Sequence, residues 1–135
     1  MKELTVNATF ESIDVVTSFV NAELDGYDCP VKTQLQIDVA IDELFSNIAR
    51  YAYTPGTGTA TVRVEIEKEP PTAVITFIDQ GIAYDPLTNP DPDTTLPAEE
   101  RQAGGLGIFL VKKTMDDVNY EYRDGQNILR IRKRL

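Results

Sequence analysis

Three short segments place polar residues or glycines where a hydrophobic core does not need them, and the first of them lies on a helix. Glu43 and Asn47 stand four residues apart in a stretch with helical periodicity, so their side chains share one face, one turn apart. A carboxylate and an amide in this arrangement can hold a metal-bound water and a hydrated Mg²⁺, because Mg²⁺ prefers oxygen ligands and keeps waters. The same spacing also suits a solvated helix flank, so spacing alone leaves both interpretations open.

The second segment is a turn after a β-rich run, Asp79-Gln80-Gly81, with Asp85 four residues further on. A carboxylate at the end of a strand can accept a hydrogen bond from an exocyclic amine, and a following glycine lets a ligand approach the backbone. Aspartate and glycine are also common in ordinary strand-ending turns. A nucleobase site and a plain turn both fit this segment.

The third segment is the glycine-rich run Gly104-Gly105-Leu106-Gly107, which opens a helix. Free N–H groups at a helix N-terminus bind phosphate oxygens, and glycines let the backbone come close to them. The run is not a Walker loop, because no Gly-Lys-Ser/Thr follows, and it is not a dinucleotide fingerprint, because no strand precedes it. A flexible hinge with glycines at the helix start fits equally well.

Hydrophobic periodicity predicts the elements that must position these segments. Apolar residues at spacings of three and four indicate helices at 11–24, at about 30–51 and at 108–115. Alternating or β-branched runs indicate strands at 4–9, 59–67, 72–78, 118–123 and 127–133. This order predicts an α+β fold, a two-layer sandwich with helices packed on one face of a mixed, largely antiparallel sheet.

Two further patterns concern the surface and the core. The stretch 79–104 holds four of the eight prolines among acidic residues, which is typical of a lid or binding loop inside one domain of residues 1–135. The apolar residues of the first helix are expected in the core: Val15, Val16, Phe19 and Val20. The basic residues of the last strand are expected mostly in solvent: Arg130, Arg132, Lys133 and Arg134.

Bulk composition excludes several classes of function. The 135 residues carry 13 basic and 22 acidic side chains, a net charge of −9, which argues against a nucleic-acid binder. The absence of histidine excludes His-based catalytic triads, His-ligated metals and a phospho-histidine relay within this chain. A single cysteine, Cys29, and the absence of a long apolar run lead us to expect a soluble, cytoplasmic protein without a membrane partner.

The three segments, taken in order, resemble the N, G1 and G2 boxes of the Bergerat-fold ATPases, a superfamily that includes gyrase-type topoisomerases, heat-shock chaperones and sensor histidine kinases. The matching runs are Asp42-Glu43-Leu44-Phe45-Ser46-Asn47, Asp79-Gln80-Gly81 and Gly104-Gly105-Leu106-Gly107-Ile108. The short length and the sequence after the last box resemble one branch closely, the bacterial anti-sigma-factor serine/threonine kinases of partner-switching systems. The resemblance covers nearly the whole chain.

The resemblance implies a role for each matching residue. Asn47 matches the asparagine that holds Mg²⁺, and Glu43 matches the candidate catalytic base that orients the attacking hydroxyl. Asp79 matches the carboxylate that reads the adenine amine, with Gly81 beneath the ring. Asp85 falls on a further acid of the G1 region, whose role in nucleotide binding stays open.

The glycine-rich box and the loop before it complete the implied nucleotide site. Gly104, Gly105, Leu106 and Gly107 match the segment whose backbone meets the phosphates, and 82–104 matches the ATP lid. The implied cofactors are ATP and Mg²⁺, and the implied activity is transfer of the γ-phosphoryl group to a serine or threonine. The implied partners are a small anti-anti-sigma-type protein, a sigma factor and a second copy of the chain in a homodimer.

The chain departs from the family pattern at a few positions, and these leave other functions open. Ala83 stands where relatives commonly have Gly or Pro, Arg50-Tyr51 replaces a more usual His-containing end of the N box, and Arg101 is the lone cation of the lid. These departures concern catalysis and partner recognition more than nucleotide binding. The alternatives are a nucleotide-gated protein-binding module without efficient transfer, a sensor-kinase catalytic fragment and a purely structural protein.

Overall fold

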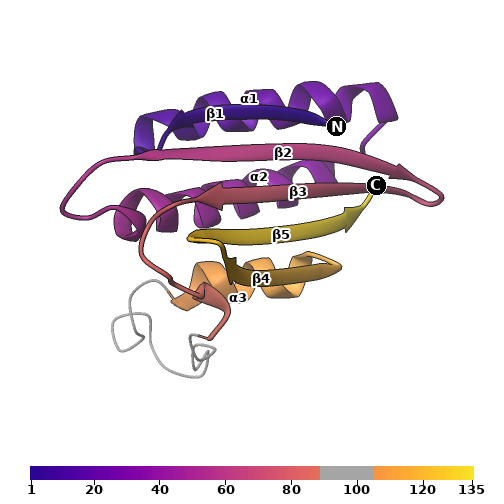
Figure 1. The fold of residues 1–135 in the computed structure, drawn as a ribbon. Helices are drawn as coiled ribbons and strands as arrows, with labels where there is room; N and C mark the ends of the chain where they lie inside the picture. Colours follow the sequence, from indigo (N-terminus) through magenta and orange to yellow (C-terminus); the bar gives the residue numbers. More distant parts are fainter. Residues whose placement is uncertain (89–104) are drawn as a thin grey trace.

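The chain was analysed as a computed structural model that describes residues 1–88 and 105–135. Within these ranges the protein has two layers, a five-stranded sheet and a layer of helices on one of its faces (Figure 1). The strands are β1 (Lys2–Asn7), β2 (Thr59–Lys68), β3 (Pro71–Asp79), β4 (Asp117–Arg123) and β5 (Gln126–Arg134). The helices are α1 (Ile13–Leu24), α2 (Val31–Asn47) and α3 (Gly105–Thr114), with short helical turns at η1 (Phe10–Ser12), η2 (Asp25–Tyr27), η3 (Ile48–Ala52) and η4 (Pro86–Thr88). The predicted α+β two-layer fold is confirmed.

The sheet order is β1-β2-β3-β5-β4, and every pair of neighbours is antiparallel. Because β5 returns beside β3, the centre of the sheet is formed by strands from both halves of the chain. In this register Asp79 at the end of β3 lies opposite Asn127 at the start of β5. Both residues lie at the end of the sheet that is far from the two chain termini (Figure 1).

Three helix boundaries differ from the predicted ones. The third helix, α3, begins at Gly105, three residues before the predicted start at Ile108. The other two differences have local reasons. The helix predicted at about 30–51 is α-helical as far as Asn47 and continues through the wider π-helical turn η3. The first helix begins with the tighter 3-10 turn η1 before α1 starts at Ile13. Irregular turns of this kind are frequent at helix ends, where hydrogen bonding changes register.

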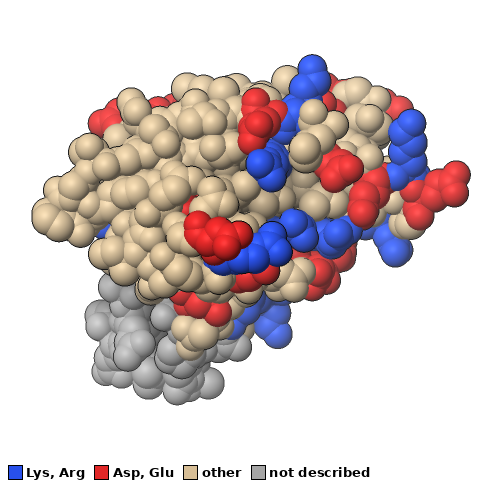
Figure 2. Space-filling model, viewed as in Figure 1, with Lys and Arg blue, Asp and Glu red and all other residues tan. Residues whose placement is uncertain are grey.

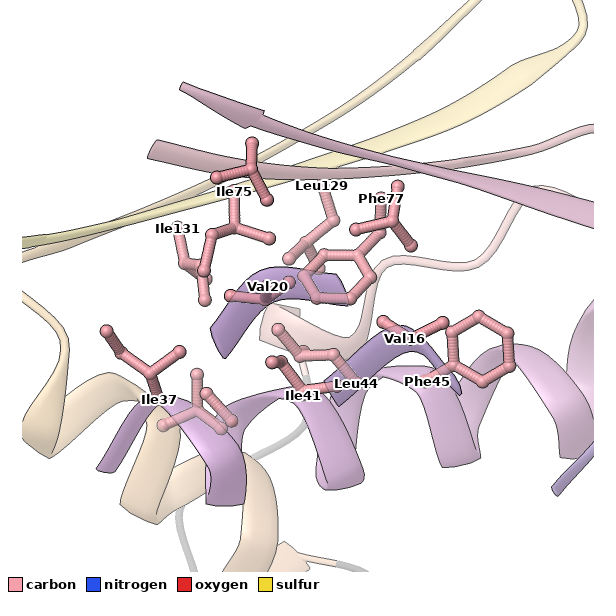
Figure 3. Close-up of a cluster of buried hydrophobic side chains, with 14 of the residues drawn as sticks. Val16, Val20, Ile37, Ile41, Leu44, Phe45, Ile75, Phe77, Leu129 and Ile131 are labelled. Carbon is pink, nitrogen blue, oxygen red and sulfur yellow. The ribbon is translucent and has the colours of Figure 1, made fainter. Parts of the chain in front are cut away.

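The core lies between the helices and the inner face of the sheet (Figure 3). The residues that fill it come from α1, α2, α3, β2, β3 and β5. Those labelled in Figure 3 are Val16, Val20, Ile37, Ile41, Leu44, Phe45, Ile75, Phe77, Leu129 and Ile131. The core prediction for the first helix was wrong at Val15, which is 52% exposed, while Phe19 is partly buried. One face of α1 meets the rest of the protein, and Val15 is turned about 100° away from its neighbour Val16.

The outer face of the sheet carries charged side chains rather than helices, and Figure 2 shows them gathered over its central strands. Arg130 donates from Nε to Thr76 Oγ1 at 3.4 Å, and Arg132 pairs with Glu67. Lys133 points to the other face, where its Nζ donates to the carbonyl of Thr114 at 2.6 Å, at the C-terminus of α3. Strand alternation explains the difference, because adjacent residues of a strand face opposite sides of the sheet.

No described helix is long and apolar enough to cross a membrane.

Candidate nucleotide site

The fold brings the three chemically distinctive segments into contact at one end of the sheet. Ile82 N donates to the carbonyl of Ala52 at 2.8 Å, which fastens the loop after β3 to the π-helical turn that follows Asn47. A Cβ on Gly81 would overlap the backbone of Ala52, so only glycine allows this approach. A Cβ on Gly107 would overlap the carboxylate of Glu43, so α2 and α3 also touch through a glycine.

A pocket opens where these segments meet, and it holds about 420 Å³ of space, part of it open to solvent. Small-molecule sites are mostly apolar with a few placed polar groups. Its walls are Leu44, Asn47, Ile48, Tyr51, Ala52, Phe77, Asp79, Ile82, Tyr84, Pro86, Tyr120, Asn127 and Leu129. The composition suits a flat, largely apolar ligand with polar edges, such as a nucleobase.

Asp79 is the buried acid of the pocket, with 4% of its surface exposed. Its Oδ1 accepts hydrogen bonds from Gly81 N and from Asn127 Nδ2, both at 2.9 Å. No described residue donates to Oδ2, so that oxygen can accept a hydrogen bond from a ligand. Because a buried carboxylate needs donors, a ligand amine at this point would complete its hydrogen bonding.

Asn127 is the residue that sequence reasoning missed, and it connects four parts of the site. Its Nδ2 donates to Asp79 Oδ1 and to the carbonyl of Ile82 at 3.0 Å. Its Oδ1 accepts from Tyr84 N at 3.1 Å and from the hydroxyl of Tyr120. The side chain therefore fixes both the Asp79 carboxylate and the first residues of the loop after β3.

A signal for Asn127 was present in the sequence. It lies two residues before Leu129 and four before Ile131, so the alternation of the last strand turns it to the buried face. A buried amide must find partners, and such a residue is a candidate for a polar site. Its place beside the Asp124-Gly125 turn made it resemble an ordinary hairpin residue.

Two tyrosines stand at the mouth of the pocket. The rings of Tyr51 and Tyr84 lie 5.3 Å apart between centroids and are tilted by 40°, which joins the end of the N-box helix to the loop after β3. The guanidinium of Arg50 lies 5.9 Å from the Tyr51 ring and 5.8 Å from the Phe10 ring. Tyr84 was not singled out from the sequence, since an isolated aromatic residue in a loop carries no spacing pattern.

Glu43 and Asn47 both belong to α2, and Asn47 lines the pocket while Glu43 contacts Gly107 of α3 beside it. Burial of its side chain raises the pKa of Glu43 above the usual 4.5, and the nearby Asp42 adds to the rise while Arg50 opposes it. A carboxylate with a raised pKa holds a proton more strongly, which suits a general base. Asn47 lines the pocket and presents an amide in its wall.

The oxygen-bearing side chains of the site fit magnesium only as an ion that is also bound by phosphates. Among the described residues no group of three or more acidic, cysteine or histidine side chains could hold a metal. Mg²⁺ is commonly bound through one or two protein oxygens together with substrate phosphates and waters, so the amide oxygen of Asn47 is compatible with this mode.

The remaining predicted site residues lie at the edge of the pocket or beyond the described ranges. Asp85 caps η4, because its Oδ1 accepts from Leu87 N at 2.9 Å, and it does not line the pocket. Gly105 and Leu106 form the first residues of α3. Gly104 and the predicted lid from residue 89 onward lie outside the described residues, while 82–88 form the loop that contributes Ile82, Tyr84 and Pro86 to the pocket wall.

The fold matches that of two solved histidine kinase structures. The histidine kinase domain of the Erythrobacter litoralis EL346 blue-light activated histidine kinase matches with a TM-score of 0.55 and 16% identity, over 93% of this chain and 60% of that one. The Acinetobacter baumannii histidine kinase AdeS matches with a TM-score of 0.54 and 14% identity, over 99% of this chain and 68% of that one. At these identities the likeness concerns the fold.

Residues 6–133 match the family model of the histidine kinase-like ATPase domain, and the chain belongs to that family. It is 29% identical over 98 residues to the serine/threonine-protein kinase BtrW of Bordetella bronchiseptica, covering 73% of this chain and 68% of the relative. It is 27% identical over 127 residues to the serine-protein kinase RsbW of Halalkalibacterium halodurans, covering 91% and 76%. The match to RsbW of Bacillus mycoides, 26% identical over 95 residues, covers 67% of this chain and spans 58% of that relative. The relatives bear out the suspected resemblance to anti-sigma-factor kinases.

Proposed function

We propose that this chain binds Mg-ATP in the pocket beside Asp79 and transfers the γ-phosphoryl group to a serine or threonine of a small anti-anti-sigma-type protein. The observation that carries the proposal is the Asp79 carboxylate in the wall of a mostly apolar pocket. Its Oδ1 accepts hydrogen bonds from two donors, and no described residue donates to its Oδ2. The ATPase family and the relatives named as serine and serine/threonine kinases support it.

The apolar pocket accounts for binding of the base. The exocyclic amine of adenine donates to Asp79 Oδ2, and Gly81 lets the loop after β3 pack against Ala52, which lines the pocket. Guanine carries a carbonyl oxygen in place of that amine, so its acceptor would face the acceptor Oδ2. The site therefore selects adenine over guanine by a hydrogen bond that only one of them can donate.

The phosphates extend from the pocket toward α2 and α3. Asn47 would hold the Mg²⁺ that neutralises the phosphate charge, and the N–H groups of Gly105, Leu106 and Gly107 at the start of α3 would bind phosphate oxygens. Glu43 lies against Gly107, so the proposed base and the phosphate-binding turn adjoin.

Phosphoryl transfer is mostly positioning and charge neutralisation, so these groups suffice for it. The partner's hydroxyl oxygen attacks the γ-phosphorus, Glu43 takes the hydroxyl proton, and the bond to the β-phosphate oxygen breaks with its electron pair leaving on ADP. Burial raises the pKa of Glu43 and makes it a stronger base than an exposed carboxylate.

We also propose the extent of the ATP-binding unit, its location in the cell and its partners. Residues 1–135 act as one ATP-binding unit in the cytoplasm, with 82–104 as the lid, without binding nucleic acid or membrane. A homodimer and capture of a sigma factor complete the partner-switching scheme that the resemblance implies. Asp85 and Gly104 remain proposed contributors to the nucleotide site.

Calorimetric titration of Mg-ATP and Mg-ADP into the wild type, Asp79→Asn and Asn47→Ala tests the site. We expect the wild type to bind both nucleotides, Asp79→Asn to lose binding, and Asn47→Ala to lose the dependence on magnesium. Wild-type protein that binds no adenine nucleotide at any magnesium concentration would contradict the proposal. Binding without transfer to a serine-bearing partner would favour a nucleotide-gated binding module instead.

A further inference from the structure

Helix α2 carries a second apolar stripe, on a face that is turned away from the core. Its buried residues, such as Ile37, Ile41 and Leu44, face the sheet, whereas three large apolar side chains on another face are exposed: Val31, Leu35 and Val39. They follow one another at intervals of four residues, so they form a continuous line along the helix. Packing of α2 against the core does not require this second line of apolar residues.

The line forms one wall of a groove, and α3 forms the other. Leu110, itself exposed, and Thr114 line the groove opposite the stripe, together with Lys32 of α2. The groove is mostly apolar, and an exposed apolar surface of this kind is typical of an interaction site. It is separate from the nucleotide pocket, with which it shares no lining residue.

The groove leads to the proposed catalytic base. Val39 lies one helical turn before Glu43 on α2, and Leu110 lies one turn after Gly107 on α3. Because Glu43 and Gly107 touch, the two walls meet at the proposed base. From Leu35 to Glu43 the distance along the helix is about 12 Å, at about 1.5 Å per residue.

The far end of the groove is basic. Lys32 is the charged side chain among the residues that line it, and it lies at the end opposite Glu43. This basic end is notable on a chain whose net charge is −9. An occupant that complements the groove has apolar residues along its length and a carboxylate at the end that meets Lys32.

We propose that this groove, which we call the α2–α3 groove, is the docking site for the protein that accepts the phosphoryl group. The occupant is an amphipathic segment of that protein with an acidic end, seated so that the acceptor hydroxyl lies beyond Val39 at Glu43. The inference rests on the proposed kinase function and adds the surface that selects the partner. A second copy of this chain is the other occupant that the test distinguishes.

The test compares two exposed apolar residues of similar exposure on different helices. Leu35 is 58% exposed in the groove, and Val15 is 52% exposed on α1, outside it. Leu35→Gln and Val15→Gln replace each with the same uncharged, helix-compatible residue, so neither variant should disturb the fold. The probes are purified small proteins of the anti-anti-sigma type that carry a serine and are encoded in the same genome as this chain. Each is incubated with the kinase variant and labelled Mg-ATP, which supplies the phosphoryl group.

We expect Leu35→Gln to raise the KM for the partner about tenfold or more while the kcat and the Kd for Mg-ATP stay within about twofold. Val15→Gln should match the wild type in all three quantities. Lys32→Glu should also raise the KM for the partner, and more at low than at high salt, because salt screens the lost attraction.

The outcomes separate the two proposals. If the wild type binds Mg-ATP but phosphorylates none of the probes, the kinase function fails and the docking site falls with it. If the wild type phosphorylates a probe and Leu35→Gln behaves like Val15→Gln, the docking site alone is overturned. If sedimentation shows that Leu35→Gln splits a wild-type dimer, the occupant is a second copy, and the docking proposal is wrong.

Discussion

Removal of the Asn127 side chain should weaken both the fold and the nucleotide site. In Asn127→Ala, Asp79 Oδ1 loses one of its two donors, the carbonyl of Ile82 loses a donor, and Tyr84 N loses its acceptor. The hydroxyl of Tyr120 loses its acceptor as well. A fully buried group left without a partner costs about 1–3 kcal/mol. The contact to Asp79 is buried, whereas those to Ile82, Tyr84 and Tyr120 are part-buried, so pocket water can replace some of them.

We therefore expect the free energy of unfolding to fall by about 2–4 kcal/mol, because water can replace about half of the four lost interactions and each of the other two costs about 1–2 kcal/mol. Asp79 Oδ1 keeps Gly81 N as a donor, which places the cost in the lower part of the usual range. For a chain of this size such a loss lowers the Tm by roughly 10 °C. The Kd for Mg-ATP should rise at least about tenfold, since the Asp79 carboxylate loses a donor that holds its orientation.

Asn119→Ala on β4 is the matched control. Asn119 is exposed and donates to Asp117 in the same strand, so the free energy of unfolding should change by less than about 0.5 kcal/mol. Chemical denaturation, thermal melting and calorimetric titration measure the three quantities. Equal stabilities for Asn127→Ala and Asn119→Ala, together with an unchanged Kd, would refute the assignment of Asn127 as the residue that positions Asp79.

Three further predictions concern the contact between α2 and α3. Because burial raises the pKa of Glu43 and the base must be ionised to accept a proton, the transfer rate should rise with pH through a pKa above 4.5. Glu43→Gln should retain Mg-ATP affinity within about threefold and lose transfer by about a hundredfold or more in a single-turnover assay; unchanged transfer would remove Glu43 as the base. Gly107→Ala should displace the Glu43 carboxylate and slow transfer about tenfold or more, whereas Gly26→Ala, with open space around its Cα, should leave it unchanged. Equal rates for the two glycine variants would contradict the importance of the contact.

The helix and strand predictions succeeded where a local period carries the information. The stripe of α2 and the alternation of β2 and β3 report which face of each element is buried, and burial of these faces drives the fold. Boundaries were less accurate at the ends of α1 and α2, where 3-10 and π-helical turns depend on neighbouring elements. The exposed Val15 shows the same limit, because an apolar side chain can belong to a helix without facing the core.

The sequence by itself determined the order of the elements, the two-layer class and the three segments that carry the nucleotide chemistry. Residue type and spacing suffice for that, since helical and strand periods are local and the boxes are short. Only the tertiary structure decided which distant residues meet: Asn127 beside Asp79, Glu43 against Gly107, and the stripe of α2 beside α3. These contacts join positions far apart in the chain, and their geometry follows from strand order and helix packing, which no local pattern encodes.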